Sequence, residues 1–388
     1  MRQGIDPYTT DLTPLAKSRG LEIEEINHAT YPPTFVLCFE PLTWLAPIPA
    51  YRLWIAMNIL FLGIALYLLL DGVPKGELQL SLVGLAILYA PITDNFYYAQ
   101  TQILILLLLT LFMRWLESGR HALAGSMLAL AGLFKVFPLI LLGYLLARRR
   151  WKAILYTGLF LMVGGLLTLG LVGAETSINF VRIVPFLTSR FYLARPANVA
   201  LGAIVSRLFW YSDLVRMGLP PVFAGAVHLT SGLEFARRAS VPLAELFVLA
   251  LTVRATLGSA KPSNNRDAPV FALWVVTAIL LSPTAWFHYL ALLFIPFVVL
   301  VRQSLGGEAS MRATRLGVAS YLVAEFLMPI YFVRSPVPIW ATWALANGPS
   351  LCLLLAYGSA YSLARTTPPG AAAEGRAEGN ERCSVVSR

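Results

Sequence analysis

Residues 271–301 read FALWVVTAILLSPTAWFHYLALLFIPFVVLV, in which two strongly apolar runs flank the stretch SPTAWFHYL (282–290). Comparable runs, each long enough to cross the roughly 30 Å hydrocarbon core of a bilayer, recur from Tyr51 to Leu363. The composition agrees, because 57% of the 388 residues are hydrophobic and 13% are charged, whereas about 25% charged is usual in soluble domains. The sequence therefore predicts an all-α fold, a polytopic transmembrane helical bundle.

The distribution of charged residues predicts which ends of the helices face the cytoplasm. The net charge of +10 comes largely from Lys and Arg in short loops such as ARRRWK (147–152), which is the positive-inside pattern of membrane topology rather than a nucleic-acid surface. About eleven membrane helices are predicted, with further interfacial helices, and the chain is expected to be a multi-pass protein of the cell membrane. The expected spans are 51–70, 80–98, 101–116, 121–134, 136–147, 152–172, 239–257, 268–284, 288–302, 312–332 and 339–363.

Three regions are predicted along the chain. Residues 1–50 form an outer polar region with an interfacial helix, 51–363 form the transmembrane domain with a long outer segment at 173–238, and 364–388 form a disordered cytoplasmic tail. This topology requires residues 121–147 to enter and leave the membrane as two short helices with a turn near Lys135. In the alternative topology 121–147 crosses once and 33–47 also crosses.

Two residues stand out at the outer face. His288 lies at a helix junction broken by Pro283, where it could bind a phosphate or sugar hydroxyl or transfer a proton. In the alternative interpretation neither residue is functional: the His288 side chain extends to lipid headgroups, and Trp286 belongs to the interfacial aromatic belt. Lys135 lies in the apolar stretch AGLFKVFPLI, either as a cation for a lipid-linked phosphate or as a side chain that extends to the interface.

Other polar residues of this face each have a structural alternative. Amides at a cavity rim suit sugar hydroxyls, but they also cap helices and bond between them, and a carboxylate in an outer loop is most simply solvated. These residues are Gln100, Gln102, Asp94, Asn95, Asn198, Asp6 and Tyr31, of which Tyr31 also opens the predicted helix at 33–47. The sequence contains no Walker A, GxGxxG, HExxH, DxD or GxSxG motif, and its three cysteines have no metal-ligand spacing. We therefore expect no metal and no cofactor.

Five short motifs occur in order: GIDPY with YPP, AQTQ, FKVFP before the basic turn, RPANVALG and SPTAWFHY. Together they resemble glycosyltransferase family 87 of the GT-C superfamily, whose members include polyprenyl-phosphate-mannose-dependent mannosyltransferases. The resemblance implies an outward cavity and inverting transfer of a hexose, such as mannose, from a polyprenyl-phosphate-linked donor to a lipid or other exported acceptor among membrane lipids. For a protein of this kind we predict Asp6 and His288 as catalytic groups, and Lys135, Gln100, Gln102, Asn198, Trp286 and Tyr31 as ligands of the donor phosphate and sugar.

The chain departs from the family pattern at three points. The asparagine of the family's GQxN element is Gln102, and the second histidine of its last element is Tyr289. Family members have a first transmembrane helix and a catalytic aspartate ahead of GxDPY, whereas this chain begins at that element, so we expect it to lack that helix, with Asp6 as a substitute base. The alternatives are a transporter or flippase of lipid-linked sugars and an inactive, truncated homologue.

Overall fold

The computed structural model describes residues 6–18, 20, 29–187, 193, 195, 197–217, 229–259, 267–331 and 347–366. Within these ranges the chain is helical and has no strand beyond one isolated bridge between Asn198 and Trp286. The first helices are α1 (Thr13–Ser18), α2 (Pro33–Cys38), η1 (Glu40–Trp44), α3 (Pro47–Leu69), α4 (Glu77–Leu88), α5 (Ala90–Tyr97), α6 (Gln102–Glu117), α7 (His121–Phe134), η2 (Phe137–Ile140), α8 (Leu141–Ala147) and α9 (Trp151–Val172). They are followed by α10 (Ala174–Leu187), α12 (Leu201–Met217), α13 (Ser231–Gly258), α14 (Ala268–Leu280), η4 (Phe287–Leu293), α15 (Phe294–Leu305), α16 (Met311–Tyr331) and α18 (Gly348–Thr366).

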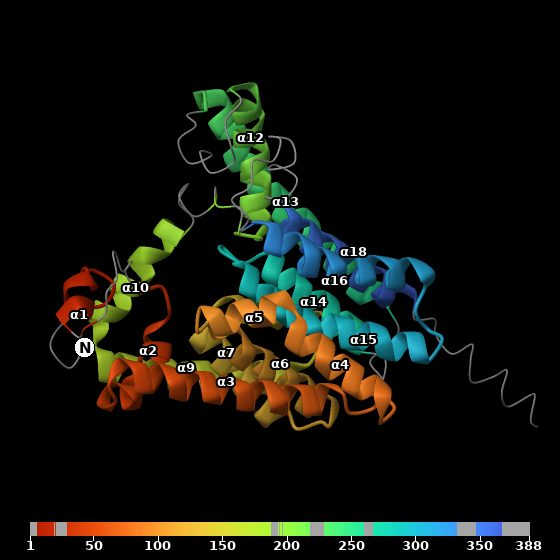
Figure 1. The fold of residues 1–388 in the computed structure, drawn as a ribbon, viewed down its shortest axis with the longest axis horizontal. Helices are drawn as coiled ribbons and strands as arrows, with labels where there is room; N and C mark the ends of the chain where they lie inside the picture. The colour runs from red at the N-terminus through yellow and green to blue at the C-terminus, as the bar shows by residue number, and fades with distance from the viewer. Residues whose placement is uncertain are drawn as a thin grey trace, which may run out of the picture.

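The helix α14 forms the centre of the bundle. Its sequence is apolar on every side, and all residues from Pro269 to Leu280 are buried, as expected for a helix surrounded by other helices. It packs against α13, α15 and α18, and Figure 1 shows this group beside a second group that contains α3, α6, α7 and α9. The buried core runs continuously through both groups.

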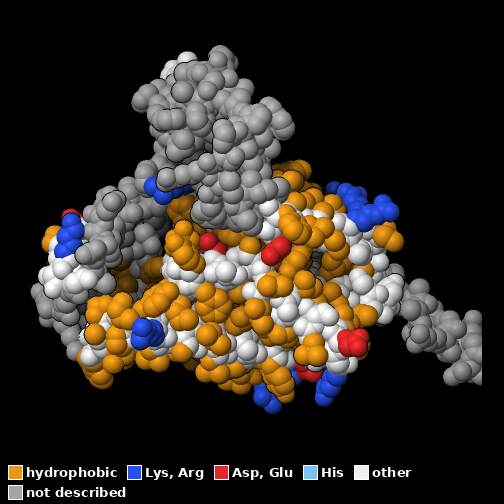
Figure 2. Space-filling model, viewed as in Figure 1, with side chains coloured by type: hydrophobic (Ala, Val, Ile, Leu, Met, Phe, Trp, Pro, Cys, Tyr) orange, Lys and Arg blue, Asp and Glu red, His pale blue; other side chains and the backbone are white. Residues whose placement is uncertain are grey.

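The outside of the bundle is apolar. The long helix α9 exposes large side chains such as Leu166 (61%) and Leu171 (75%), and Figure 2 shows hydrophobic side chains over most of the described surface. Four helices are long and apolar enough to cross a membrane, or five if the bent pair α4–α5 is one span, counting described residues only. The all-α polytopic fold is confirmed, while the number of eleven spans is not.

Prolines interrupt the helices at two places. The segment predicted as one helix at 80–98 is bent by 48° between α4 and α5, because Pro91 in the first turn of α5 has no N–H with which to continue α4. Residues 121–147 are also interrupted: α7 ends at Phe134, Lys135 is extended (φ −146°, ψ 129°) and η2 follows with Pro138 in its first turn. The turn near Lys135 is confirmed, and the passage of its two arms through a membrane stays a prediction.

Residues 33–47 do not form one long helix. They form the short helices α2 and η1, which Phe39 joins, and η1 begins at Glu40 with Pro41 in its first turn. The alternative topology, in which 33–47 crosses the membrane, has no support in these short helices. Of the long segment at 173–238, the structure describes residues 173–187, 193, 195, 197–217 and 229–238, which contain α10, α12 and the beginning of α13, and the other residues of the segment lie outside the described ranges.

Candidate active site

The turn between α5 and α6 places two glutamines. Ala99 adopts a positive φ of 49°, which directs the chain out of α5 and into α6. Asn95 holds this turn, since its Oδ1 accepts a hydrogen bond from the Gln102 backbone N–H at 2.9 Å and its carbonyl accepts one from the Gln100 N–H at 2.8 Å. The Asn95 side chain thus satisfies one of the free N–H groups at the start of α6. The Gln102 side chain, at the first residue of α6, is fully buried.

Lys135 is a buried cation between two tyrosine rings. It is 7% exposed, and its Nζ lies 4.3 Å from the ring centroid of Tyr289 and 4.9 Å from that of Tyr31. In the part of the chain that the structure describes, Lys135 forms no ion pair with a carboxylate. Cation–π contacts offset only part of the cost of removing an ammonium group from water, so this position favours an anionic ligand.

Tyr31 connects this cation to the glutamine turn. Its hydroxyl donates a hydrogen bond to Gln100 Oε1 at 2.6 Å, and its ring stacks on Phe35 with centroids 4.7 Å apart. The same ring faces Lys135. Tyr31 therefore contacts two residues that are predicted to bind the donor: Gln100 through its hydroxyl and Lys135 through its ring.

His288 lies at the beginning of η4 and contacts a carboxylate. Its Nδ1 is 3.3 Å from Asp94 Oδ2, and both side chains are largely buried. Its Nε2 is buried and has no hydrogen-bond partner among the described residues, and Lys135 is close enough for its charge to act on the imidazole. Gln102 lies beside the Tyr289 hydroxyl, yet neither atom of its amide makes a well-formed hydrogen bond. The cluster therefore contains a cation and several polar atoms that are free to bind a ligand.

Asn198 fixes the backbone next to this cluster. Its side chain is fully buried, and its Oδ1 accepts hydrogen bonds from the backbone N–H groups of Ala200 and Ala285, both at 3.1 Å. A backbone bond from Val199 N–H to the Ala285 carbonyl, at 2.6 Å, joins the same two segments. These bonds fix the stretch that leads into His288.

Arg207 in turn holds the Asn198 segment. It is fully buried, and its guanidinium donates to the carbonyls of Arg195 and Asn198 at 2.9 and 2.7 Å. Sequence reasoning missed Arg207, whose periodic helical surroundings carry no sign of this role.

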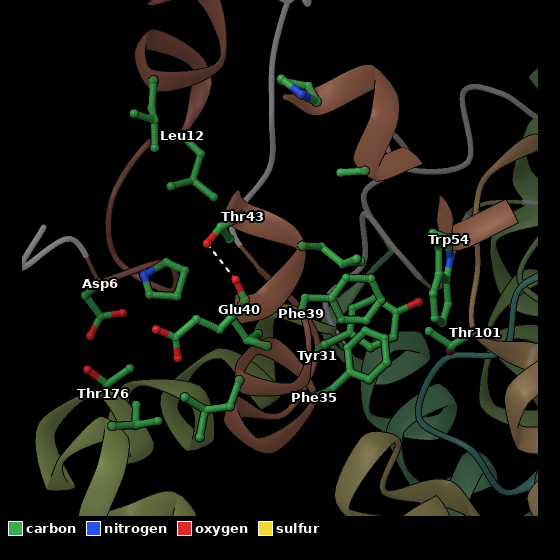
Figure 3. Close-up of a pocket in the computed structure, with 18 of the residues that line it drawn as sticks. Asp6, Leu12, Tyr31, Phe35, Phe39, Glu40, Thr43, Trp54, Thr101 and Thr176 are labelled. Atoms are coloured by element: carbon green, nitrogen blue, oxygen red, sulfur yellow. Dashed lines mark hydrogen bonds between the residues drawn. The ribbon is translucent and has the colours of Figure 1, made fainter. Parts of the chain in front are cut away.

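A cavity of about 1270 Å³ adjoins the cluster, and we call it the outer cavity after the side of the membrane predicted for it from the sequence. Figure 3 shows its aromatic end, with Tyr31, Phe35 and Trp54, and its polar end, where Asp6 and Glu40 face one space. The described residues that line this cavity include three carboxylates, Asp6, Glu40 and Glu175, and no Lys or Arg. The cavity thus suits uncharged hydroxyl groups, which donate hydrogen bonds to carboxylates.

Asp6 is tied to the wall of this cavity. Its Oδ1 accepts a hydrogen bond from the Tyr8 N–H at 2.8 Å, and its Oδ2 accepts one from Asn179 Nδ2 at 2.9 Å. The Tyr8 hydroxyl donates to the Tyr31 carbonyl at 2.7 Å. Burial, assisted by the Asp6 charge, raises the pKa of Tyr8 well above its usual value, so this phenol stays a neutral donor.

The structure brings most, but not all, of the predicted site residues together. Five of them form a connected group around the lysine: Lys135, Tyr31, Gln100, Gln102 and His288. Trp286 forms a backbone bridge with Asn198, and Asp6 lies across the outer cavity. The roles of all these residues stay predictions. Sequence analysis placed Asp94 at the cavity rim without pairing it with His288, because nothing within one segment signals a contact between two distant ones.

Comparison with known proteins identifies the family. The model of glycosyltransferase family 87 matches residues 29–283, which is well over half of the 388-residue chain. No curated protein and no solved structure matches the chain. The matched range contains the α5–α6 turn, Lys135 and the start of SPTAWFHYL. The chain therefore belongs to glycosyltransferase family 87 and is a membrane glycosyltransferase.

Proposed function

We propose that this protein transfers a hexose, such as mannose, from a polyprenyl-phosphate donor to a hydroxyl group of a lipid or other exported acceptor at the outer face of the cell membrane. The observation that carries the proposal is Lys135, an ammonium group 7% exposed and without a carboxylate partner among the described residues. Such a cation among apolar helices is costly unless an anion joins it. The phosphate of a lipid-linked sugar supplies that anion and brings the sugar with it.

The surroundings of Lys135 suit a phosphate that departs during the reaction. Lysine offers three N–H donors and a compact charge, and the buried Gln102 amide beside Tyr289 adds a further donor. Negative charge grows on the phosphate oxygen as its bond to the sugar breaks, so Lys135 stabilises the transition state more than the bound substrate. Gln100 and Tyr31, joined at 2.6 Å, then lie where the sugar meets the outer cavity.

The outer cavity is the proposed entrance for the acceptor. Its carboxylates accept hydrogen bonds from hydroxyl groups and repel phosphate, which separates the acceptor end from the donor end. Large apolar side chains around it are exposed, including Trp44 (73%) and Tyr51 (48%), and these suit the hydrocarbon part of a lipid acceptor.

The reaction forms one bond and breaks another at the anomeric carbon. The acceptor oxygen bonds to this carbon, the bond from the carbon to the phosphate oxygen breaks, and its electron pair stays with the phosphate. The proton of the acceptor hydroxyl passes to a general base. Two residues are proposed as catalytic: Asp6, in the acceptor cavity, and His288, beside Lys135. No step draws on a metal ion or cofactor.

The test compares the loss of transfer when a positive charge is removed at Lys135 and when one is removed at Lys152. The full-length protein in lipid nanodiscs is given radiolabelled polyprenyl-phosphate-mannose and octyl α-D-mannopyranoside as acceptor. Lys135→Met should lower transfer by about 100-fold, the usual loss when one stabilising donor is removed from an active site, and Lys135→Arg should keep part of the activity. Lys152→Met, which removes an exposed cation at the start of α9, is the matched control and should be neutral.

Two results would contradict the proposal. Full turnover of Lys135→Met with an unchanged KM for the donor would show that this lysine does not bind the phosphate. Movement of labelled donor across proteoliposome membranes without any transfer would instead favour the transporter.

A further inference from the structure

A second cavity lies at the other end of α3. It has a volume of about 670 Å³ and is lined by the ends of α3 and α6, the start of α14 and part of α15, and we call it the inner cavity. Trp54, in the first half of α3, lines the outer cavity, whereas Leu68 and Leu69 at the end of α3 line the inner one. The 23 residues of α3 extend about 35 Å, which is close to the thickness of a bilayer's hydrocarbon core. Because α3 is long and apolar enough to cross a membrane, the inner cavity lies at the membrane surface opposite the outer cavity.

Arg302 on α15 brings a cation to the inner cavity. Its Nη2 donates hydrogen bonds to the carbonyls of Leu69 and Asp71, and these bonds hold α15 against the end of α3. Within the described chain Arg302 forms no ion pair with a carboxylate, and its Nη1 forms no hydrogen bond. Arg114 lines the same cavity and is paired with the exposed carboxylate of Asp71. The guanidinium of Arg302 therefore keeps a donor for an anionic ligand.

Glu117, the last residue of α6, brings a carboxylate to the same cavity. The residue is half-buried, and its carboxylate forms no ion pair or hydrogen bond with the residues that the structure describes. Burial raises the pKa of Glu117 to about 7, although the charge of Arg302 acts in the opposite direction. A half-buried carboxylate is costly as an anion when no cation joins it. Glu117 thus favours a ligand with a positive group.

These two groups select a ligand that carries both charges. A simple anion would bind Arg302 but would be repelled by Glu117 and by Glu308, which also lines the cavity. A simple amine would bind the carboxylates but would be repelled by the guanidinium groups. Phosphoethanolamine has a phosphate and a primary ammonium on one short carbon chain, so it can satisfy Arg302 and Glu117 together. The volume of the inner cavity lies in the range that binds small molecules.

The remaining lining indicates that this headgroup belongs to a lipid. Apolar side chains from all four helices lie beside the charged groups: Leu68, Leu69, Met113, Phe271, Ile295 and Val299. A soluble zwitterion has no use for such contacts, whereas the first carbons of a lipid's acyl chains are buried by them. The cavity also lies at a membrane surface, which is where phospholipid headgroups are found.

We propose that the inner cavity binds a phospholipid of the phosphatidylethanolamine class, with its phosphate on Arg302 and Arg114 and its ammonium group on Glu117. The bound lipid joins the ends of α3, α6 and α15 at the surface opposite the Lys135 cluster. This site takes no part in the transfer reaction, and the proposal does not depend on the proposed function.

The experiment measures the binding of three ligands to the full-length protein in detergent, by isothermal titration calorimetry. Dioctanoyl-phosphatidylethanolamine carries both charges, dioctanoyl-phosphatidylglycerol carries only the phosphate, and O-phosphoethanolamine carries both charges without acyl chains. The ethanolamine lipid should bind about tenfold more tightly than the glycerol lipid, because only its ammonium group forms a charged bond with Glu117. It should also bind more tightly than O-phosphoethanolamine, which lacks the apolar contacts.

Substitutions identify the cavity as the binding site. Glu117→Gln keeps the size of the side chain and should weaken the ethanolamine lipid about tenfold, without weakening the glycerol lipid. Arg302→Gln should weaken both lipids; if it lowers the folded yield on size exclusion, Arg114→Gln replaces it and should also weaken both. Glu77→Gln, which removes an exposed carboxylate at the start of α4 outside the cavity, is the matched control and should change neither affinity.

Four results would overturn the proposal. The ethanolamine lipid might show no binding, or bind no better than the glycerol lipid, and either result would refute recognition of the ammonium group. A Glu117→Gln variant that keeps the wild-type preference would place the binding elsewhere. Binding of O-phosphoethanolamine as tight as that of the lipid would exclude a lipid as the occupant. Since none of these measurements uses the sugar donor, loss of transfer activity would refute the proposed function and leave this proposal intact.

Discussion

Replacing Asn198 with alanine should loosen the backbone segment that leads into His288 and reduce the stability of the protein. The Asn198 side chain is fully buried, and its Oδ1 accepts hydrogen bonds from two backbone N–H groups, those of Ala200 and Ala285, at 3.1 Å. Both of these residues are also fully buried, so water cannot replace the lost acceptor. Each stranded donor costs about 1–3 kcal/mol, which gives about 2–6 kcal/mol for Asn198→Ala.

The assay is unfolding of the detergent-solubilised protein, together with kcat and the KM for the donor. Stability and kcat should fall together, because the Asn198 bonds hold the segment that leads into His288, and donor KM should change little. Asn198→Asp is the matched variant: it keeps an oxygen at the same place and should retain more stability than alanine. The prediction of Asn198 as a ligand of the donor gives the opposite pattern. A raised KM with unchanged stability would refute the supporting role argued here.

Two further results are expected. Gly125→Ala should lower the free energy of unfolding by about 1–3 kcal/mol in the same assay, because a Cβ on Gly125 would lie 2.8 Å from the backbone N of Thr157 on α9. Gly158→Ala is the control and should be neutral, since a Cβ there meets nothing within 4 Å. Equal effects of the two substitutions would contradict the tight packing of α7 on α9. In a cysteine-free chain, Thr284→Cys should react with an impermeant thiol reagent from outside the cell and Trp151→Cys, at an exposed position, only after permeabilisation; the reverse pattern would place the site on the cytoplasmic side.

The sequence was a good guide to the helices because their formation depends on local properties. Runs of apolar residues predicted α9 and α14 closely, since burial or lipid contact rewards every turn of such a run. The turn at Lys135 was also predictable, because Pro138 cannot continue a helix. The bend at Pro91 was missed when 80–98 was assigned as a single span, although the same rule applies there.

The site was only partly predictable, because its geometry depends on contacts between distant segments. The apolar runs and the bias of basic residues among the loops placed His288 and Lys135 at one face of the bundle, and both belong to the same cluster. The pairing of His288 with Asp94 and the bond from Asn198 to Ala285 depend on how α5, η4 and the start of α12 pack, and no pattern within one segment encodes that packing. The motifs singled out residues that lie close together in the structure, whereas the contacts that these residues make could be identified only from the fold.

The unsatisfied groups around Lys135 are themselves evidence for a ligand. Several buried polar side chains of the bundle pair with one another, as Thr252 does with Thr277 at 2.9 Å and Asp267 with Arg148 at 2.8 Å, while a few single atoms such as Asn58 Oδ1 have no partner among the described residues. Around Lys135 three groups without such partners in the described chain lie together: the lysine ammonium, the Gln102 amide and His288 Nε2. Burying any one of these groups without a partner costs about 1–3 kcal/mol or more of folding free energy. Three such costs in one place would destabilise the fold unless a ligand supplies the missing partners. A phosphate-bearing donor and an acceptor hydroxyl would satisfy all three at once, which is why this cluster, rather than the larger outer cavity, is where we place the chemistry.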